Sequence, residues 1–202
     1  LQLWVDADLD LGNHTFSHPD YHSTENEEFF ADIIKGEKIT KDLLSQKNKK
    51  LEYFRHPYLH SGNSKEKKKA LEEFLKEHYY TIAPVSIDNG EWIYARAYEK
   101  AYNKNDVELM RQIGSEYVNY MIDKTIYFEN QSIKLFGYEL KQILLVHANM
   151  INADYFDELA EELVKRNYIF ISLKEALTDT AYQSEDTFTG RGGISWLHRW
   201  SY

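Results

Sequence analysis

The sequence predicts an α/β protein made of β/α units around a parallel sheet or barrel. Short apolar stretches with strand character alternate along the 202 residues with longer stretches of helical periodicity, and no linker, repeat or low-complexity segment separates them. Polar side chains follow several of the expected strands, and the chemistry of β/α proteins collects at the carboxyl ends of strands. We therefore expect one domain over residues 1–202, with its functional site at the strand ends.

Each element follows from periodicity and from capping residues. Residues 9–13 read as a first short strand, and residues 25–34 as a helix whose Phe and Ile side chains recur three to four positions apart. Thr40 is placed to cap a second helix. The segment 142–147 (QILLVH) has the continuous apolar character of a strand buried on both faces. The other expected strands are 49–54, 80–87 and 168–172, and the other expected helices are 64–78, 106–128, 154–166 and 173–177.

Composition excludes several classes of function. The net charge of −9 repels phosphate backbones, so nucleic acid is not an expected partner. The absence of cysteine removes disulfides, thiolate metal sites and cysteine nucleophiles. No apolar run approaches the roughly 18 residues that a transmembrane helix needs. The 16 tyrosines and 4 tryptophans suit the faces of sugar rings, although a tyrosine-rich core explains them equally.

Two histidines follow the first expected strand. His14 and His18 stand four residues apart in N-H-T-F-S-H, a spacing that lets both imidazoles face one metal ion. A pair of surface histidines in a polar loop explains the same letters. We expect His22 to be a solvated neighbour rather than a further ligand.

Three further motifs carry candidate chemistry. Arg55 ends the next expected strand and is either a group that orients a carboxylate or one half of a structural ion pair. Glu91 and Trp92 follow an Asp-Asn-Gly turn, which forms either a sugar platform with an adjacent acid or an ordinary turn. His147 ends the segment 142–147 and is either a structural group or, beside a metal, a general acid.

Taken in order, these motifs resemble those of the polysaccharide deacetylase, or NodB-homology, family of metal-dependent carbohydrate esterases. The family's H-[S/T]-x-x-H motif is matched by His14 to His18. Its arginine-proline-aromatic motif is similar to the segment from Arg55 to Tyr58, which reads R-H-P-Y.

The later motifs extend the resemblance over the rest of the chain. The family's aspartate-tryptophan motif is similar to Glu91 and Trp92, with glutamate in place of aspartate. Its L-x-H motif matches Leu145 and His147, and the closing segment 193–200 (GISWLHRW) resembles the tail of one bacterial branch.

One family motif has no counterpart here. The family places T-F-D-D-G at the end of its first strand, well before the histidine pair, and draws from it one metal ligand and the general base. The segment before His14 does not contain it, and Asp6, Asp8 and Asp10 lie too close to His14 to replace it. The resemblance therefore implies a distorted (β/α) barrel of the NodB-homology type that is N-terminally truncated and lacks its first β/α unit.

The resemblance also implies a metal centre. His14 and His18 would hold a divalent ion, expected to be Zn²⁺, whose third ligand, an aspartate, is missing from this chain. A site without its charged ligand and its base binds zinc more weakly and activates water poorly. We therefore expect the chain as given to be nearly inactive and its longer parent to be active.

The same resemblance assigns roles around that ion. The expected reaction is hydrolysis of N-acetyl groups from a carbohydrate, a linear amide, by metal-activated water. His147 would protonate the leaving amine, while Arg55 and Glu91 would tune the catalytic carboxylate and histidine. The residues expected to bind substrate are Tyr58, through its backbone N–H, together with Trp92 and Leu145.

Two other functions fit the same letters. One is a non-catalytic carbohydrate-binding homologue, and the other is a small-molecule amidase on the same scaffold. In each carbohydrate interpretation the partner is an acetylated glycan or oligosaccharide. An open barrel edge would favour a homo-oligomer, because unpaired strand edges recruit another chain. The family resemblance implies that the protein is extracytoplasmic or secreted.

Overall fold

The computed structural model describes residues 1–202, and its backbone packs into two compact units. The first unit consists of Leu1–Pro84 with Asp186–Ile194 and Tyr202. The second unit consists of Val85–Glu185 with Ser195–Ser201. The single-domain organisation expected over residues 1–202 stays a prediction.

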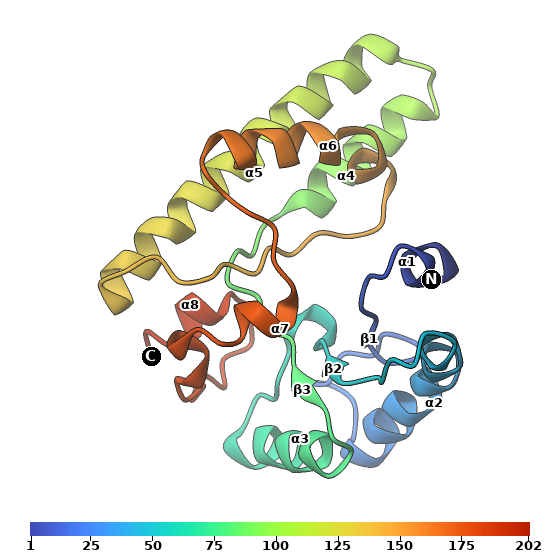
Figure 1. Ribbon diagram of the computed structural model, residues 1–202, viewed down its shortest axis with the longest axis vertical. Helices are drawn as coiled ribbons and strands as arrows, with labels where there is room; N and C mark the ends of the chain where they lie inside the picture. Colours follow the sequence, from blue (N-terminus) through green and yellow to red (C-terminus); the bar gives the residue numbers. More distant parts are fainter. The chain divides into compact units, whose positions relative to one another are not determined.

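The first unit contains a three-stranded parallel sheet in the order β1-β2-β3 (Figure 1). In register, Tyr53 pairs with Gly12 on one side and with Thr81 on the other. Helices connect the strands, as parallel neighbours require. A mixed α/β fold with a small parallel sheet and many helices is thereby confirmed, while the complete barrel stays a prediction. The strands are β1 (Gly12–Asn13), β2 (Tyr53–Phe54) and β3 (Thr81–Ile82).

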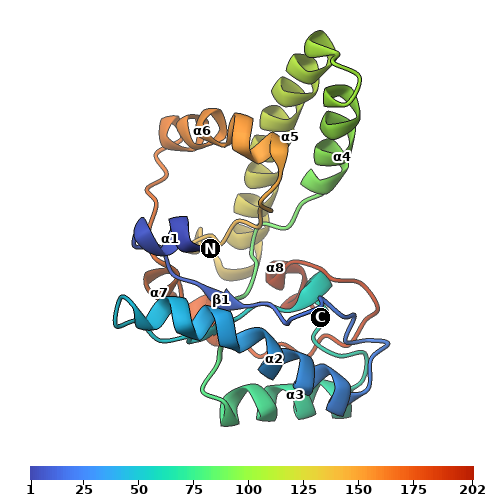
Figure 2. The same cartoon turned by 90° about the vertical axis from the view of Figure 1, so that its right-hand side faces the viewer.

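Helices α2 (Asn26–Ser45) and α3 (Lys65–Glu77) lie side by side in the first unit (Figure 2). Ser64 caps α3, as its position predicts, by accepting a hydrogen bond from a backbone N–H of the first turn. A short helix, α1 (Gln2–Asp6), precedes the sheet. The core of this unit is an aromatic and aliphatic cluster: Tyr21, Phe29, Ile33, Phe54, Leu71, Leu75 and Tyr80.

The expectation of a separate helix capped by Thr40 was wrong. Helix α2 continues without a break, and Thr40 is buried within it. The only conventional breaker in the interval is Gly36, and a helix tolerates one glycine at a cost of about 1 kcal/mol. Burial of one long face of α2 therefore outweighs the tendency of Thr40 to start a new helix.

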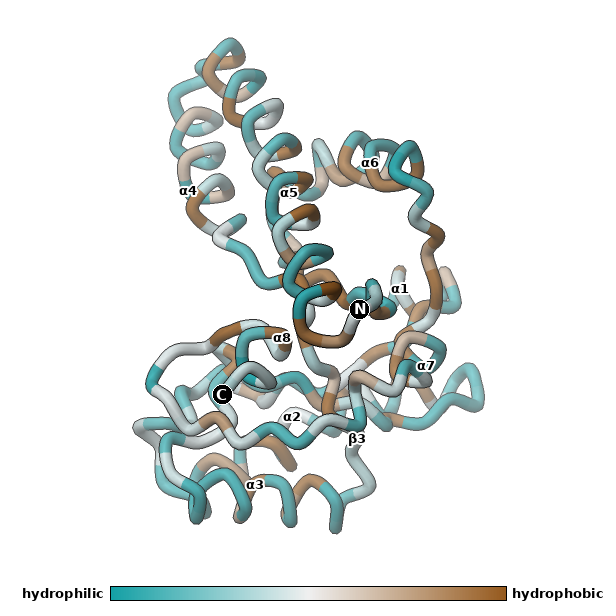
Figure 3. The backbone as a smooth tube through the Cα atoms, turned by 90° about the vertical axis from the view of Figure 1, so that its left-hand side faces the viewer, coloured by the Kyte–Doolittle hydropathy of each residue, from teal (hydrophilic) through white to brown (hydrophobic).

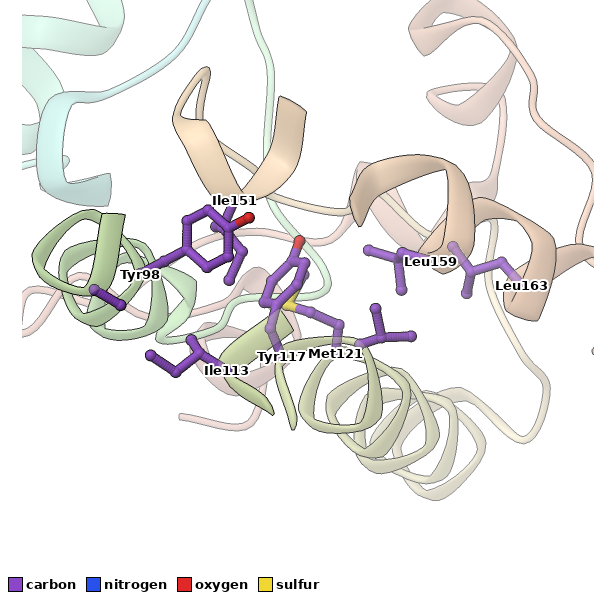
Figure 4. Packing of buried hydrophobic residues seen from close by; sticks show 9 residues of the cluster. Tyr98, Ile113, Tyr117, Met121, Ile151, Leu159 and Leu163 are labelled. Atoms are coloured by element: carbon purple, nitrogen blue, oxygen red, sulfur yellow. The ribbon is translucent and has the colours of Figure 1, made fainter. Parts of the chain in front are cut away.

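The second unit is mainly helical, with three long helices that pack around a shared apolar cluster (Figure 4). They are α4 (Glu91–Tyr102), α5 (Val107–Phe136) and α6 (Met150–Lys165). Hydrophobic and hydrophilic residues alternate along α5, as expected of an amphipathic helix (Figure 3). The labelled cluster residues are Tyr98, Ile113, Tyr117, Met121, Ile151, Leu159 and Leu163.

Both ends of α5 follow from residues visible in the sequence. Asp106 accepts a hydrogen bond from the backbone N–H of Leu109 and so caps the start of the helix. Gly137 ends it in the left-handed conformation, with φ of 81°, which glycine adopts without a Cβ clash. The remaining elements of the second unit are short: α7 (Leu173–Ala176), η2 (Thr180–Gln183) and α8 (Trp196–Arg199).

Two expected strands are absent from the second unit. The segment 142–147 is extended but forms only a single bridge, between Leu144 and Ile87. The segment 168–172 pairs with nothing as a strand, and its Ile169 and Phe170 side chains are exposed. An apolar run of five or six residues predicts a strand only if neighbours supply a ladder, and helices provide the core of this unit instead.

The segment expected to be a turn at Glu91 and Trp92 is also different, because α4 begins at Glu91. The three preceding residues are irregular, the Asn89 side chain accepts from the Glu91 N–H at 3.0 Å, and Gly90 flanks the helix at its N-terminal end. None of the helices, α5 included, combines the length and the apolar character that a membrane-spanning helix requires.

Candidate functional site

The candidate site of the first unit is the loop after β1, and Asn13 fixes where that loop begins. Asn13 is buried, and its side-chain amide donates to the carbonyl of Ile33 at 2.9 Å and to the hydroxyl of Tyr80 at 2.8 Å. Its side-chain oxygen accepts from the backbone N–H of Thr15 at 2.8 Å. One amide therefore joins the end of β1, helix α2 and the segment before β3.

The loop carries His14 and His18 with their rings close together. The ring centroids lie 4.7 Å apart with the planes at 72°. Thr15 and His18 both adopt positive φ values, 67° and 57°. The Thr15 hydroxyl accepts from the backbone N–H of His18 at 3.0 Å and so helps to hold this tight turn. The structure thus brings together the two residues that the sequence predicts as metal ligands.

The Asp32 carboxylate on α2 holds the middle of the loop, and sequence reasoning missed it. It accepts from the backbone N–H groups of Phe16 and Ser17 and from the Ser17 hydroxyl, each at 2.9 Å. Burial raises the pKa of Asp32, but these hydrogen bonds lower it by more, so the pKa lies below its ordinary value. The signal in the sequence was an acid on the loop-facing side of a helix, which does not identify its partner.

The chain after β2 brings Arg55 beside the histidine loop. The Arg55 N–H donates to the carbonyl of Asn13 at 2.9 Å, which extends the β1–β2 pairing by one bond. The carbonyl of Arg55 lies 2.8 Å from Nδ1 of His14. Burial lowers the pKa of the Arg55 guanidinium to about 10, and its Nε is buried without a hydrogen-bond partner.

The turn that follows Arg55 is strained. Pro57–Leu59 forms a single 3₁₀ turn, η1, in which Tyr58 and Leu59 both have positive φ, at 55° and 56°. Such values are costly for residues with a Cβ and concentrate at functional sites. The exposed Tyr58 ring lies against His18, with centroids 4.5 Å apart. The predicted substrate-binding residue therefore adjoins the predicted metal ligands.

A separate candidate site lies in the second unit and centres on Glu91. Its carboxylate is fully buried at the first residue of α4. It accepts from the His147 backbone N–H at 3.0 Å, and its Oε1 lies 2.7 Å from Nδ1 of the same residue. Asn149 donates to both carboxylate oxygens, at 3.1 and 2.9 Å, and Asn152 donates to one at 3.4 Å.

These contacts orient His147. A carboxylate only accepts hydrogen bonds, so Nδ1 of His147 carries a proton toward Glu91, and the other ring nitrogen, Nε2, faces outward. The side chain of His147 is 53% exposed, which leaves Nε2 accessible. The structure thus pairs two residues that the sequence places 56 positions apart.

The remaining predicted residues of the second unit have different environments. Trp92 is 58% exposed on α4. Leu145 is half-buried, and its carbonyl accepts from the Asn89 side chain at 2.7 Å. That bond ties the segment before His147 to the turn before Glu91. The assignment of Trp92 and Leu145 to substrate binding stays a prediction.

The donor chemistry of the histidine loop fits a divalent metal ion. The Arg55 carbonyl only accepts, so Nδ1 of His14 carries the proton and Nε2 keeps the lone pair that a metal needs. Imidazoles held by a carbonyl in this way are the usual ligands of zinc. A further three-donor group, Asp20, His22 and His60, lies on the same unit and makes a possible Asp/His/His metal site.

Residues 1–78 match the polysaccharide deacetylase family. No significant match was found among curated proteins or among solved structures. The family resemblance that the motifs predict is thereby confirmed for the segment with the histidine loop, Arg55 and Tyr58. The Glu91–His147 pair lies beyond the matched residues, so its role depends on its own geometry.

Proposed function

We propose that this protein is a metal-dependent hydrolase that removes N-acetyl groups from a carbohydrate. The observation that carries the proposal is the pair His14 and His18, with the proton of His14 fixed on Nδ1 by the Arg55 carbonyl. The match over residues 1–78 supports the deacetylase class. The substrate class is a linear amide on a glycan, which hydrolysis with one water converts to acetate and a free sugar amine.

His14 and His18 would hold the ion, most suitably Zn²⁺ given two imidazole ligands. A bound ion of this kind supplies an acidified water and polarises the acyl carbonyl. The Tyr58 backbone N–H, presented by the strained turn, would donate to the developing oxyanion. The buried guanidinium of Arg55 would orient the catalytic carboxylate of the family.

His147 would supply the proton that the leaving amine needs. A sugar amine is a poor leaving group, so its nitrogen must be protonated as the C–N bond breaks. Glu91 keeps a proton on Nδ1 of His147 and stabilises the charged ring that can donate from Nε2. Glu91 is thus a positioning residue, and Asn149 and Asn152 hold its carboxylate in place.

We further propose that the given chain has little activity by itself. Its sequence lacks the T-F-D-D-G motif from which the family draws a carboxylate ligand and the base. Loss of proton transfer alone costs on the order of 10²–10⁴-fold in rate. A parent chain with this motif in a preceding β/α unit, and with the complete barrel, would be active.

The test compares the 202-residue chain with a chain extended at its N-terminus by a β/α unit that carries the T-F-D-D-G motif. Both are incubated with zinc and N-acetylglucosamine oligomers, and the released amines are counted. We expect the extended chain to be faster by on the order of 10²–10⁴-fold. His14→Gln should abolish turnover and the binding of zinc by the His14–His18 pair, whereas His147→Gln should abolish turnover and leave zinc binding unchanged.

Other outcomes decide against the proposal. Turnover by the 202-residue chain at the rate of the extended chain contradicts the proposed inactivity. Tight binding of the oligomers by both chains without released amine favours the carbohydrate-binding homologue instead. Release of amine only from small acyl-amides favours the amidase. His78→Gln, on an exposed histidine at the end of α3, serves as the matched control for the histidine variants.

We also propose that the edge of the sheet supports self-association. β1 ends the sheet order on one side, and an unpaired strand edge recruits another chain. Sedimentation velocity over a hundredfold concentration range tests this. A sedimentation coefficient that rises with concentration supports a dimer, and a constant monomer value contradicts it.

A further inference from the structure

We propose that Asp20, His22 and His60, together the Asp20 cluster, bind a divalent transition-metal ion at a site separate from His14 and His18. One ligand atom from each of the three residues lies within 4.8 Å of the other two. The inference rests on no residue of the proposed hydrolase reaction. The expectation that His22 is a solvated neighbour was wrong, because His22 is half-buried and its ring stacks on that of His60.

The backbone around Asp20 prepares the cluster. The Asp20 carbonyl accepts from the Ser23 N–H at 3.1 Å and from the Thr24 hydroxyl at 2.7 Å, which closes a turn over residues 20–24. The His22 N–H donates to Oδ1 of Asp20 at 2.9 Å. These bonds place the Asp20 carboxylate and the His22 ring on the same side of one short turn.

A second segment brings His60 to this turn. His60 directly follows the strained η1 turn, and its Nδ1 lies 2.6 Å from Oδ1 of Asp20. The side chain of Asn63 donates to the His22 carbonyl at 3.0 Å. Two loops that stand about 40 positions apart in the sequence are therefore joined at the cluster.

The donor set selects the class of ion. One carboxylate and two imidazoles suit Zn²⁺, Co²⁺ or Ni²⁺, whereas Ca²⁺ and Mg²⁺ prefer oxygen ligands. Both hydrogen bonds to the Asp20 carboxylate end on Oδ1, so Oδ2 is the oxygen available to a cation. Zinc lies about 2.0–2.2 Å from its nitrogen and oxygen ligands, so the three ligand atoms must move closer together around the ion.

Binding requires one ring to turn. The His22 and His60 rings are stacked in parallel, with centroids 3.9 Å apart and planes at 1°. Nitrogen lone pairs lie in the plane of the ring, so parallel rings cannot both aim at one ion. Rotation about the bond to one imidazole exchanges the stacking contact for a metal bond. The ion would then fasten the turn at Asp20 to the segment after η1.

The cluster is separate from the histidine loop because Tyr58 lies between them. The Tyr58 ring contacts His18 on one side, at 4.5 Å between centroids, and His60 on the other, at 5.8 Å. An ion at the Asp20 cluster would therefore set the position of the turn that carries Tyr58. This is a structural role rather than a catalytic one.

The experiment titrates Zn²⁺ and Co²⁺ into the metal-free 202-residue chain and into two sets of variants. Calorimetry gives the number of ions, and the visible absorption of Co²⁺ reports its ligands. The double variant His14→Gln/His18→Gln should keep the Co²⁺ spectrum of the Asp20 cluster. His60→Gln should weaken that binding by at least the 10–100-fold that loss of an outer-sphere partner causes.

Nitrogen-15 NMR of the histidine rings identifies the ligands directly among the eight histidines. In the His14→Gln/His18→Gln chain, zinc should shift the ring signals of His22 and His60. Asp20→Asn offers a second variant if His60→Gln fails to fold, as judged by circular dichroism. His78→Gln is the matched control and should bind as the unchanged chain does.

Two results would overturn the inference. In the first, His14→Gln/His18→Gln abolishes all binding of Zn²⁺ and Co²⁺. In the second, zinc binds but the His22 and His60 ring signals stay in place. Failure of the proposed hydrolase leaves this result untouched, because the readouts are ion binding and ring signals rather than turnover.

Discussion

At the scale of single residues, buried or half-buried carboxylates organise the site. Asp32 holds the loop of the histidine pair through three hydrogen bonds, and Glu91 holds His147 through its backbone N–H and its ring nitrogen Nδ1. Each carboxylate accepts from both backbone and side-chain donors. Such charge-assisted bonds are stronger than bonds between neutral groups, so a single acid can fix a loop.

Replacing Asp32 should loosen the histidine loop. Asp32→Ala removes the carboxylate that accepts from Phe16 and Ser17 and leaves the Phe16 N–H only the carbonyl of residue 32, at 3.2 Å. We expect a loss of roughly 2–3 kcal/mol in the free energy of unfolding. Asp32→Asn keeps one acceptor oxygen and should lose less. Urea unfolding measures both, and an unchanged midpoint for Asp32→Ala would show that the loop is held by other contacts.

The same residue sets a pH dependence. The folded pKa of Asp32 lies below its ordinary value, because hydrogen bonds outweigh the opposing effect of burial. Its stabilising contribution is therefore complete above the unfolded pKa of about 3.9 and is lost as the pH falls through the lower folded pKa. The stability difference between the unchanged chain and Asp32→Asn should shrink in this acidic window. A difference that stays constant down to the lowest pH contradicts the assignment.

Replacing Glu91 should release His147. Glu91→Ala leaves the donors of His147, Asn149 and Asn152 without their buried acceptor, and we expect a loss of roughly 3 kcal/mol in the free energy of unfolding. His147 should also lose its preference for the tautomer with the proton on Nδ1, which nitrogen-15 NMR detects. Glu99→Ala, on the exposed side of the same helix, should stay within about 0.5 kcal/mol of the unchanged chain. If the two substitutions changed the free energy of unfolding equally, Glu91 would not be the residue that holds His147.

At the scale of elements, close backbone approaches decide where loops lie. Helix α2 comes so near the histidine loop at Gly36 that a Cβ there would meet Thr15 backbone atoms at 2.8 and 2.9 Å. The η1 turn is approached in the same way by Gly193 from the end of the chain. Glycine is required at such contacts because any side chain would displace backbone rather than a flexible group.

Gly193→Ala should displace the Tyr58 turn. A Cβ at Gly193 would lie 1.7 Å from the Tyr58 carbonyl oxygen, so the backbone must move, and we expect a loss of about 1–3 kcal/mol. Gly192→Ala is the control, since its Cβ would meet only an Ile194 methyl group at the ordinary distance of 3.5 Å. Thermal unfolding compares the two. Equal melting temperatures would mean that this close approach does not exist in solution.

At the scale of the whole molecule, the chain returns to its first unit after completing most of its second. The segment Asp186–Ile194 belongs to the first unit, although more than 100 residues separate it from α3. Lys68 on α3 pairs with Asp186 at 2.6 Å, with 7% and 14% of the two side chains exposed, and also donates to the Phe188 carbonyl. This buried pair fastens the late segment to the early one.

Breaking this pair should destabilise the first unit. Asp186→Ala leaves the Lys68 ammonium buried without its carboxylate. We expect a loss of about 3–5 kcal/mol in the free energy of unfolding, which is typical when one partner of a buried ion pair is removed. The exposed neighbouring change Glu185→Ala should have almost no effect. Denaturant unfolding measures both variants. A small effect of Asp186→Ala would mean that the segment is held by packing alone.

The sequence by itself determined the local features of this protein. The helix expected over 106–128 continues to Phe136, so its end was predicted too early. The starts expected at residues 64 and 106 are confirmed, with Ser64 and Asp106 as caps, and the spacing of His14 and His18 predicted two neighbouring rings. These features depend on residues within a few positions of one another. Local hydrogen bonds and helical periodicity can therefore be predicted from the amino-acid sequence.

Only the tertiary structure decided the contacts between distant segments. The apolar segment 142–147 read as a buried strand, but it finds a single bridge, because helices supply the core around it. The partners of Asp32 and Glu91 lie 15 to 61 positions away, and His60 lies 40 positions from Asp20. A carboxylate or an imidazole in a sequence shows what it can bind, and the folded chain decides which donor reaches it.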